Sequence, residues 1–76
     1  MIKINLKLFV TLSKYLPEGS EDFEVPENTS VKTIISDLGI EHKTVKLIFV
    51  NGKKQDDKYI LKNSDRLGLF PPVGGG

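Results

Sequence analysis

The sequence lacks the residues on which several common kinds of functional site depend. It contains no cysteine, which excludes disulfide bonds, thiolate metal ligands and a thiol nucleophile. Its single histidine, His42, makes a histidine-based metal centre or a serine–histidine–aspartate triad hard to build. We therefore expect no resident metal and no bound cofactor.

Excess charge and long apolar runs are missing as well. The 76 residues include 11 basic and 10 acidic side chains, and this even balance argues against nucleic acid as a partner. The apolar runs are too short to span a bilayer, and no apolar signal segment opens the chain. We therefore predict a cytoplasmic protein without a membrane partner. Because 38% of the residues are hydrophobic, the chain is also unlike a disordered one.

What the chain does have is a clear pattern of strands around one helix. Alternation of apolar and polar residues predicts a strand over 2–10, and Val31, Ile34, Ile35 and Leu38 form one apolar helical stripe. Asn51-Gly52 is a strong signal for a two-residue hairpin turn. The further strands are predicted at 21–25, 45–50, 53–55 and 66–70.

This order of elements predicts an α+β fold. One amphipathic helix covers one face of a mixed sheet of four to five strands. The first and last strands are apolar enough to pair at the centre of the sheet, where they must run parallel. That arrangement is the ubiquitin-like β-grasp, with Leu61 filling the core from a loop.

The end of the sequence is the first feature that a core does not need. Pro71 and Pro72 cannot donate backbone hydrogen bonds, so the last strand stops at Phe70 and the chain leaves as a stiff stem through Val73. Gly74, Gly75 and Gly76 follow without side chains. We divide the chain into a domain at 1–73 and a free, flexible C-terminal tail at 74–76, which could enter a narrow tunnel of a partner. The alternative is an unstructured chain end without a function.

The second feature is a set of outward apolar residues. Parity places Phe9 and Phe70 on the sheet face opposite the helix, on neighbouring strands. If Leu47 and Phe49 face the core, then Ile48 faces outward with the two phenylalanines, and Val50 is a further candidate. An exposed apolar cluster of this kind is typical of a protein interface. The alternative is a face that is only partly exposed or is covered by a loop.

The ending Phe-Pro-Pro-Val-Gly-Gly-Gly at 70–76 resembles that of the small, sulfur-carrying subunit of molybdopterin synthase. The resemblance extends over the whole chain and includes the Phe9 strand, the Val50-Asn51 step into the hairpin and Leu61 four residues before Asp65. Outside the tail, the pattern fits ubiquitin or the thiazole sulfur carrier almost as well.

The resemblance implies a carrier rather than a complete enzyme. An E1-like partner would use ATP to adenylate the carboxylate of Gly76, which would then become a thiocarboxylate. The tail would insert into the large synthase subunit and donate sulfur to a pterin precursor in the pathway to the molybdenum or tungsten cofactor. By the same resemblance, Phe9 and Phe70 match aromatic interface positions, and Lys54 stands where relatives can have an apolar one. Pro71, Pro72 and Val73 complete the expected partner interface.

Three other functions fit the same residues. The chain could carry sulfur for thiamine thiazole synthesis, although Phe-Pro-Pro-Val speaks against that pathway. It could be a ubiquitin-like modifier whose Gly76 forms an isopeptide bond with a lysine. It could also be an interaction module with an inert tail, which would bind through Phe9, Ile48 and Phe70.

Overall fold

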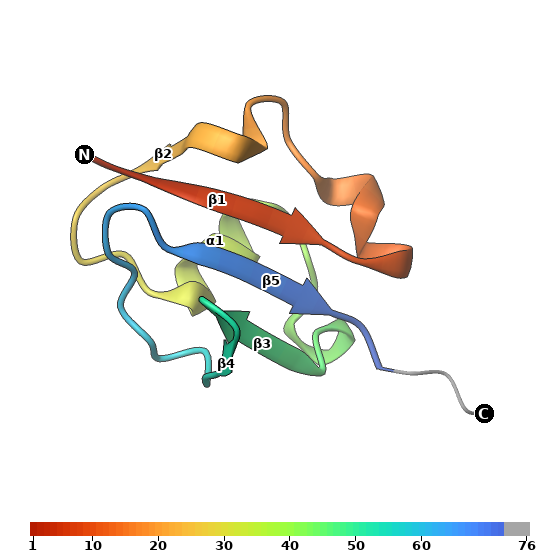
Figure 1. The fold of residues 1–76 in the computed structure, drawn as a ribbon. Coiled ribbons are helices and arrows are strands. Elements are labelled where there is room, and N and C mark those ends of the chain that lie inside the picture. The colour runs from red at the N-terminus through yellow and green to blue at the C-terminus, as the bar shows by residue number, and fades with distance from the viewer. Residues whose placement is uncertain (73–76) are drawn as a thin grey trace.

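Five strands form one mixed sheet in the computed structural model, which describes residues 1–72 (Figure 1). Their order across the sheet is β2-β1-β5-β3-β4. The central β1 and β5 are parallel, and the other neighbouring pairs are antiparallel. The fold is the predicted β-grasp. The strands are β1 (Ile2–Leu8), β2 (Phe23–Val25), β3 (Leu47–Val50), β4 (Lys53–Lys54) and β5 (Arg66–Phe70), and the helix is α1 (Val31–Asp37).

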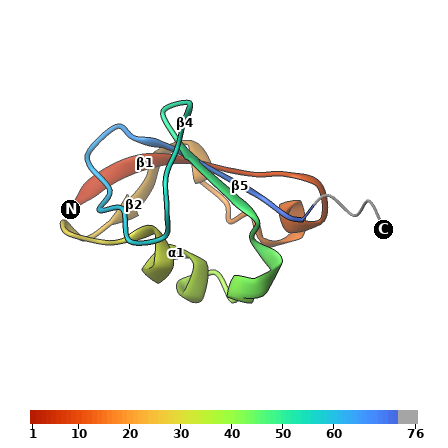
Figure 2. The same cartoon turned by 90° about the horizontal axis from the view of Figure 1, so that it is seen from below.

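The core lies between the sheet and α1, which covers one face only (Figure 2). The period-two pattern of β1 turns its apolar side chains toward the helix, and the helical stripe turns three of its own toward the sheet. Each fully buried side chain of this kind contributes about 1.5–3 kcal/mol. The buried set from these two elements and β5 comprises Ile2, Ile4, Leu6, Leu8, Val31, Ile34, Ile35, Leu67 and Leu69.

Local side-chain chemistry fixes the ends of α1. Ser30 caps the helix, because its Oγ accepts a hydrogen bond of 3.2 Å from the backbone N–H of Thr33. After the helix, Gly39 adopts a φ of +78°, a left-handed conformation that glycine takes without steric cost. The sequence signals at both ends of the helix are therefore confirmed.

The first strand is shorter than predicted. It ends at Leu8 rather than at residue 10, because Val10 has a φ of +54° and begins a 3-10 helix over Val10–Tyr15. A left-handed residue cannot continue a strand. The second strand is shorter too, since Ser20–Asp22 forms another 3-10 turn before β2. These turns change the ends of the strands but not their pairing.

The turn after β3 is the predicted hairpin. Asn51 and Gly52 both have positive φ, +54° and +82°, as a type I′ turn requires. Further along, Leu61 is buried, so the prediction that it fills the core from a loop is confirmed.

The predicted orientation of β3 is wrong. Ile48 is only 9% exposed and Val50 only 2%, and both belong to the core, whereas Leu47 and Phe49 are half-buried on the opposite face. The pairing explains this, because Ile48 lies opposite the buried Leu69 and Val50 opposite the buried Leu67. Side chains opposite one another in a sheet share a face, so β5 dictates which side of β3 is inside.

Two kinds of feature are absent from the described residues. Over 1–72, no helix has the length and apolar character needed to cross a membrane. In the same part of the chain, no group of three or more histidine, cysteine or acidic side chains could hold a metal ion.

Candidate docking site

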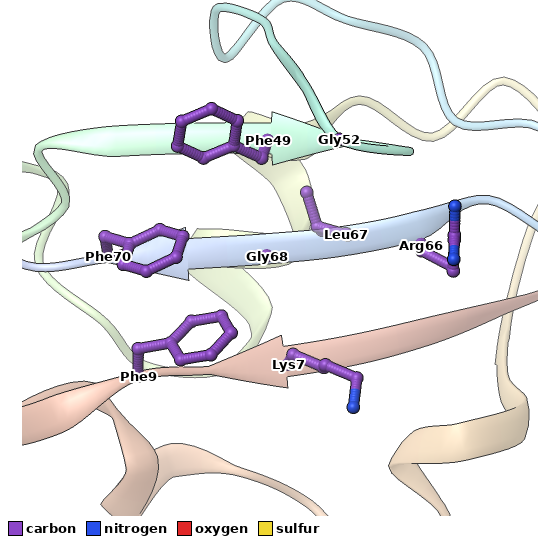
Figure 3. A pocket seen from close by; sticks show the side chains of 8 residues that line it. All are labelled: Lys7, Phe9, Phe49, Gly52, Arg66, Leu67, Gly68 and Phe70. Carbon is purple, nitrogen blue, oxygen red and sulfur yellow. The ribbon is translucent and has the colours of Figure 1, made fainter.

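A groove of about 410 Å³ lies on the face of the sheet opposite α1 (Figure 3). Its walls come from three adjacent strands and the segments that follow them: β1, β5 and β3. The lining residues are Lys7, Phe9, Phe49, Gly52, Arg66, Leu67, Gly68 and Phe70. The groove therefore occupies the central strands, which bring together residues far apart in the sequence.

Three phenylalanine rings form one end of this groove. The rings of Phe9 and Phe70 stack with centroids 4.2 Å apart and planes only 4° from parallel. Phe49 meets Phe70 edge to face, with a centroid distance of 5.5 Å and an angle of 81°. Aromatic pairs of these geometries are worth about 0.5–1.5 kcal/mol each beyond the area they bury. The three rings are only half-buried, so they form a rigid apolar surface that is partly open to solvent.

Gly68 forms the floor of the groove. It lies on β5, between β1 and β3, and its register partners are Lys7 on β1 and Phe49 on β3. A Cβ atom at this position would come within 3.3 Å of the Phe9 ring. Glycine at this position thus leaves room for the edge of the Phe9 ring to approach β5.

The other end of the groove is cationic. Arg66 lies at the start of β5, farthest from the rings, and the Lys7 side chain begins opposite Gly68 and extends away from the rings (Figure 3). Arg66 is held in place through its backbone, since its N–H donates to Asn51 Oδ1 and its carbonyl accepts from the Asn51 N–H, both at 2.9 Å. The hairpin turn therefore fixes the start of β5 and the position of the backbone from which the Arg66 side chain extends.

A buried carboxylate anchors the same corner. Asp65 is 6% exposed and accepts hydrogen bonds from Asn51 Nδ2 at 2.9 Å, from the Lys62 N–H at 2.8 Å and from the Tyr59 hydroxyl at 3.2 Å. Burial, and secondarily the charge of Asp65 and this hydrogen bond, raise the pKa of Tyr59 above its usual value. The network joins the hairpin turn and the 59–62 loop to the start of β5.

The structure brings some of the predicted interface residues together and not others. Phe9 and Phe70 meet as expected, whereas Ile48 lies in the core on the opposite side of the sheet. Pro71 is buried and Pro72 is exposed directly after β5, whose last carbonyl accepts from the Lys46 N–H at 2.8 Å. Val73, Gly74, Gly75 and Gly76 lie outside the described residues, as does the predicted boundary between domain and tail.

Phe49 is the site residue that sequence reasoning assigned to the core. One sequence signal could have found it, namely Gly68 in the middle of an apolar strand. A strand glycine leaves a gap beside it that a neighbouring aromatic side chain fills well, and Phe49 lies directly opposite Gly68. That inference needs the register between β3 and β5, which alternation alone does not supply.

Several solved structures share this fold. A Pyrococcus furiosus protein described as a candidate subunit 1 of molybdopterin converting factor is 26% identical, with a TM-score of 0.73 over 96% of this chain and 100% of that one. Small archaeal modifier protein 1 of Haloferax volcanii is 21% identical, with a TM-score of 0.71 and coverage of 96% and 100%. A further Haloferax volcanii protein, known from a solution structure, is 21% identical with a TM-score of 0.76 and coverage of 99% and 87%.

The sequence itself matches a family model. Among curated proteins, none matches significantly. The model described as the ThiS family, in contrast, matches residues 6–76, which include the end of β1, the whole of β5, the groove residues and the glycines after Val73. This match covers nearly the whole chain, and the chain therefore belongs to the ThiS family.

Proposed function

We propose that this protein carries sulfur for the synthesis of molybdopterin, with the carboxylate of Gly76 as its reactive group. The observation that carries the proposal is that the family match runs through β5 and Pro71-Pro72 to residue 76. The likeness to the Pyrococcus furiosus protein, whose title names a molybdopterin converting factor, supports the choice of this pathway for the proposal.

The chemistry fits the residues that the chain contains. A carboxylate is a poor electrophile until a good leaving group is attached. An E1-like enzyme would transfer the adenylate of ATP to Gly76 and release pyrophosphate, and a sulfur nucleophile would then displace AMP to leave a thiocarboxylate. The chain has no cysteine that could hold sulfur on a side chain, so the C-terminal carbonyl is the natural carrier. The proposal places the chain in the cytoplasm, where ATP is available.

Docking and reach would be separate tasks in such a carrier. The aromatic end of the groove lies at the end of β5, close to where the chain continues into Pro71 and Pro72. A partner held by Phe9, Phe49 and Phe70 would therefore receive the tail nearby, which raises the effective concentration of Gly76 at its active site. The two partners in this proposal are the activating enzyme and the large subunit of molybdopterin synthase.

Intact-mass analysis of the protein purified from its native host tests the proposal directly. We expect a species heavier than the unmodified chain by the difference between one sulfur and one oxygen atom. Deletion of Gly76 should abolish this species, whereas Gly74→Ala, which keeps the length and the terminal carboxylate, should retain it. A mass adduct linked to lysine would instead favour a protein modifier, and an unmodified chain in cells that make molybdopterin would contradict sulfur carriage.

The pathway needs a second measurement, because thiazole synthesis would use the same activation step. A host strain that lacks this protein should lose molybdopterin-dependent enzyme activity and should still grow without added thiamine. The opposite pair of results would assign the carrier to thiazole synthesis.

A further inference from the structure

Among the described residues, the groove is lined by positive charges only, although the whole chain has nearly equal numbers of basic and acidic residues. On the same face, Lys3 on β1 lies directly opposite Glu24 on β2, so these two charges offset one another. Arg66, in contrast, lies opposite Asn5, and Lys7 lies opposite Gly68. Within residues 1–72 the ion pair found is Lys43 with Glu41, so no carboxylate of that part lies within 4 Å of either cation.

The groove therefore has two chemically different ends at a defined spacing. Gly68 lies two residues after Arg66 along β5, which corresponds to about 7 Å of strand. An occupant whose bulky apolar group rests over Gly68 would place a group about 7 Å away beside Arg66, toward which the Lys7 side chain extends from its position opposite Gly68 (Figure 3). In an extended segment, side chains two residues apart share a face and have the same spacing.

Other occupants fit less well. Over residues 1–72 the groove contains no acidic side chain, so the same face of a second copy of this chain would offer no carboxylate to Lys7 and Arg66. Stacking of nucleobases needs free aromatic faces, but Phe9 and Phe70 already stack on one another, and Phe49 packs against Phe70. The formal net charge of +1 adds little general attraction for a polyanion.

We propose that the groove binds an extended, acidic segment of a protein partner in which a bulky apolar side chain is followed two residues later by a carboxylate. The apolar side chain packs over Gly68 against the rings, and the carboxylate pairs with Lys7 and Arg66. The inference rests on the proposed function for the existence of a docking partner, and it adds the chemistry that the partner presents.

Peptide titrations test this chemistry without the sulfur pathway. The probes are three blocked peptides, Gly-Leu-Ser-Glu-Gly and its variants with glutamine or lysine in place of glutamate, added to the isotope-labelled protein. We expect the glutamate peptide to bind roughly fivefold more tightly than the glutamine peptide, because one exposed ion pair is worth about that factor. Its amide shift changes should centre on Lys7, Gly68 and Phe70.

Charge reversal supplies the matched variants. Lys7→Glu leaves Arg66 as the opposing cation, so it should remove the preference for the glutamate peptide, and Lys7→Glu combined with Arg66→Glu should reverse it. Lys32→Glu makes the same substitution at an exposed position of α1, on the other side of the sheet, and should leave the order of affinities unchanged. If Arg66→Glu disturbs the fold, Arg66→Gln provides the loss of charge alone, and the amide spectrum reports whether each variant is folded.

Several results would overturn the proposal. They are equal binding of the three peptides, no binding of any, shift changes away from the groove, tighter binding of a deoxythymidine oligonucleotide, and dimerisation through this face. Each of these can occur in a protein that still acquires sulfur at Gly76, so failure here and failure of the proposed function are distinguishable by intact mass.

Discussion

At the scale of single residues, one carboxylate determines how the groove is held. Asp65 is buried and satisfied by hydrogen bonds from Asn51, Tyr59 and Lys62, which belong to the hairpin turn and the loop that precede β5. Breaking a buried polar network is destabilising, because a polar group that loses its hydrogen bond remains desolvated without compensation. The site depends on this network through the placement of Arg66.

Replacing Asp65 by alanine should therefore destabilise the protein. We expect the free energy of unfolding to fall by about 2 kcal/mol, since three part-buried hydrogen bonds lose their acceptor. Urea denaturation measures the change. Asp37→Ala, on the exposed surface of α1, is the matched control and should change stability by less than about 0.5 kcal/mol. Equal effects of the two substitutions would show that the network does not contribute.

The raised pKa of Tyr59 predicts how stability depends on pH. In the folded state the phenol keeps its proton to a higher pH than in the unfolded chain. The stability that protonated Tyr59 contributes is therefore fully present below about pH 10 and is lost as the pH rises through the higher pKa of the folded state. Ultraviolet titration of a Tyr15→Phe variant, in which Tyr59 is the remaining tyrosine, should place its ionisation above the usual value. An ordinary midpoint in the folded protein would contradict this assignment.

The residues of the site were only partly predictable. The outward orientation of Phe9 and Phe70 can be predicted from the alternation within their own strands, because the apolar residue that precedes each phenylalanine belongs to the core face. Phe49 does not, since β3 is apolar on both faces and its parity is ambiguous. In the structure, the pairing of Ile48 with Leu69 determines which face of β3 is buried. The local sequence pattern does not predict this long-range contact.

At the scale of elements, α1 illustrates how a short helix is stabilised. It spans seven residues, too few for stability in isolation, so it relies on its buried apolar stripe and its cap. The cap is Ser30, whose hydroxyl oxygen accepts from the Thr33 N–H. Capping residues and apolar spacing are both visible in the sequence, and for that reason the helix could be predicted.

Ser30→Ala should lower the free energy of unfolding by about 1 kcal/mol, because the Thr33 N–H loses its acceptor at the start of the helix. Ser30→Asp is the control, because an aspartate side chain can accept the same hydrogen bond. Thermal or urea denaturation compares the three proteins. Equal loss of stability in both variants would indicate that the cap is not the reason for the effect.

The ends of the strands were harder to predict than the strands themselves. Apolar–polar alternation continues to residue 10, but Val10 adopts a positive φ and is 74% exposed. Valine rarely takes this conformation, which costs roughly 1–2 kcal/mol, so tertiary contacts that begin at the Phe9–Phe70 stack outweigh local preference. Such competition between local and distant contacts is invisible in a window of a few residues.

At the scale of the whole molecule, the two faces of the sheet have separate tasks. The helix side forms the core, and the opposite side holds the groove. The topology was predictable because hydrophobic first and last strands, a single helix and a hairpin leave few arrangements. The spacing between the aromatic and cationic ends was not, because it depends on the register of β1, β5 and β3.

Phe70→Ala should separate binding from folding. We expect partner binding to weaken by about 2 kcal/mol or more, since central aromatic residues dominate interfaces, and the cost to stability to be smaller because the ring is half-buried. Calorimetric titration with the proposed partner, the large subunit of molybdopterin synthase, and urea denaturation give the two quantities. Phe23→Ala, which removes a half-buried ring packed against the core, should show the reverse. Unchanged affinity of Phe70→Ala would remove Phe70 from the interface.

The central position of β5 has a consequence for synthesis on the ribosome. This strand joins β1 to β3, yet it is translated after every other strand of the described chain. A nascent chain that stops before residue 66 lacks the strand with which both halves pair, so it cannot complete the sheet. Incomplete products are therefore expected to be degraded as unfolded chains rather than to persist and compete with the complete protein for its proposed partners.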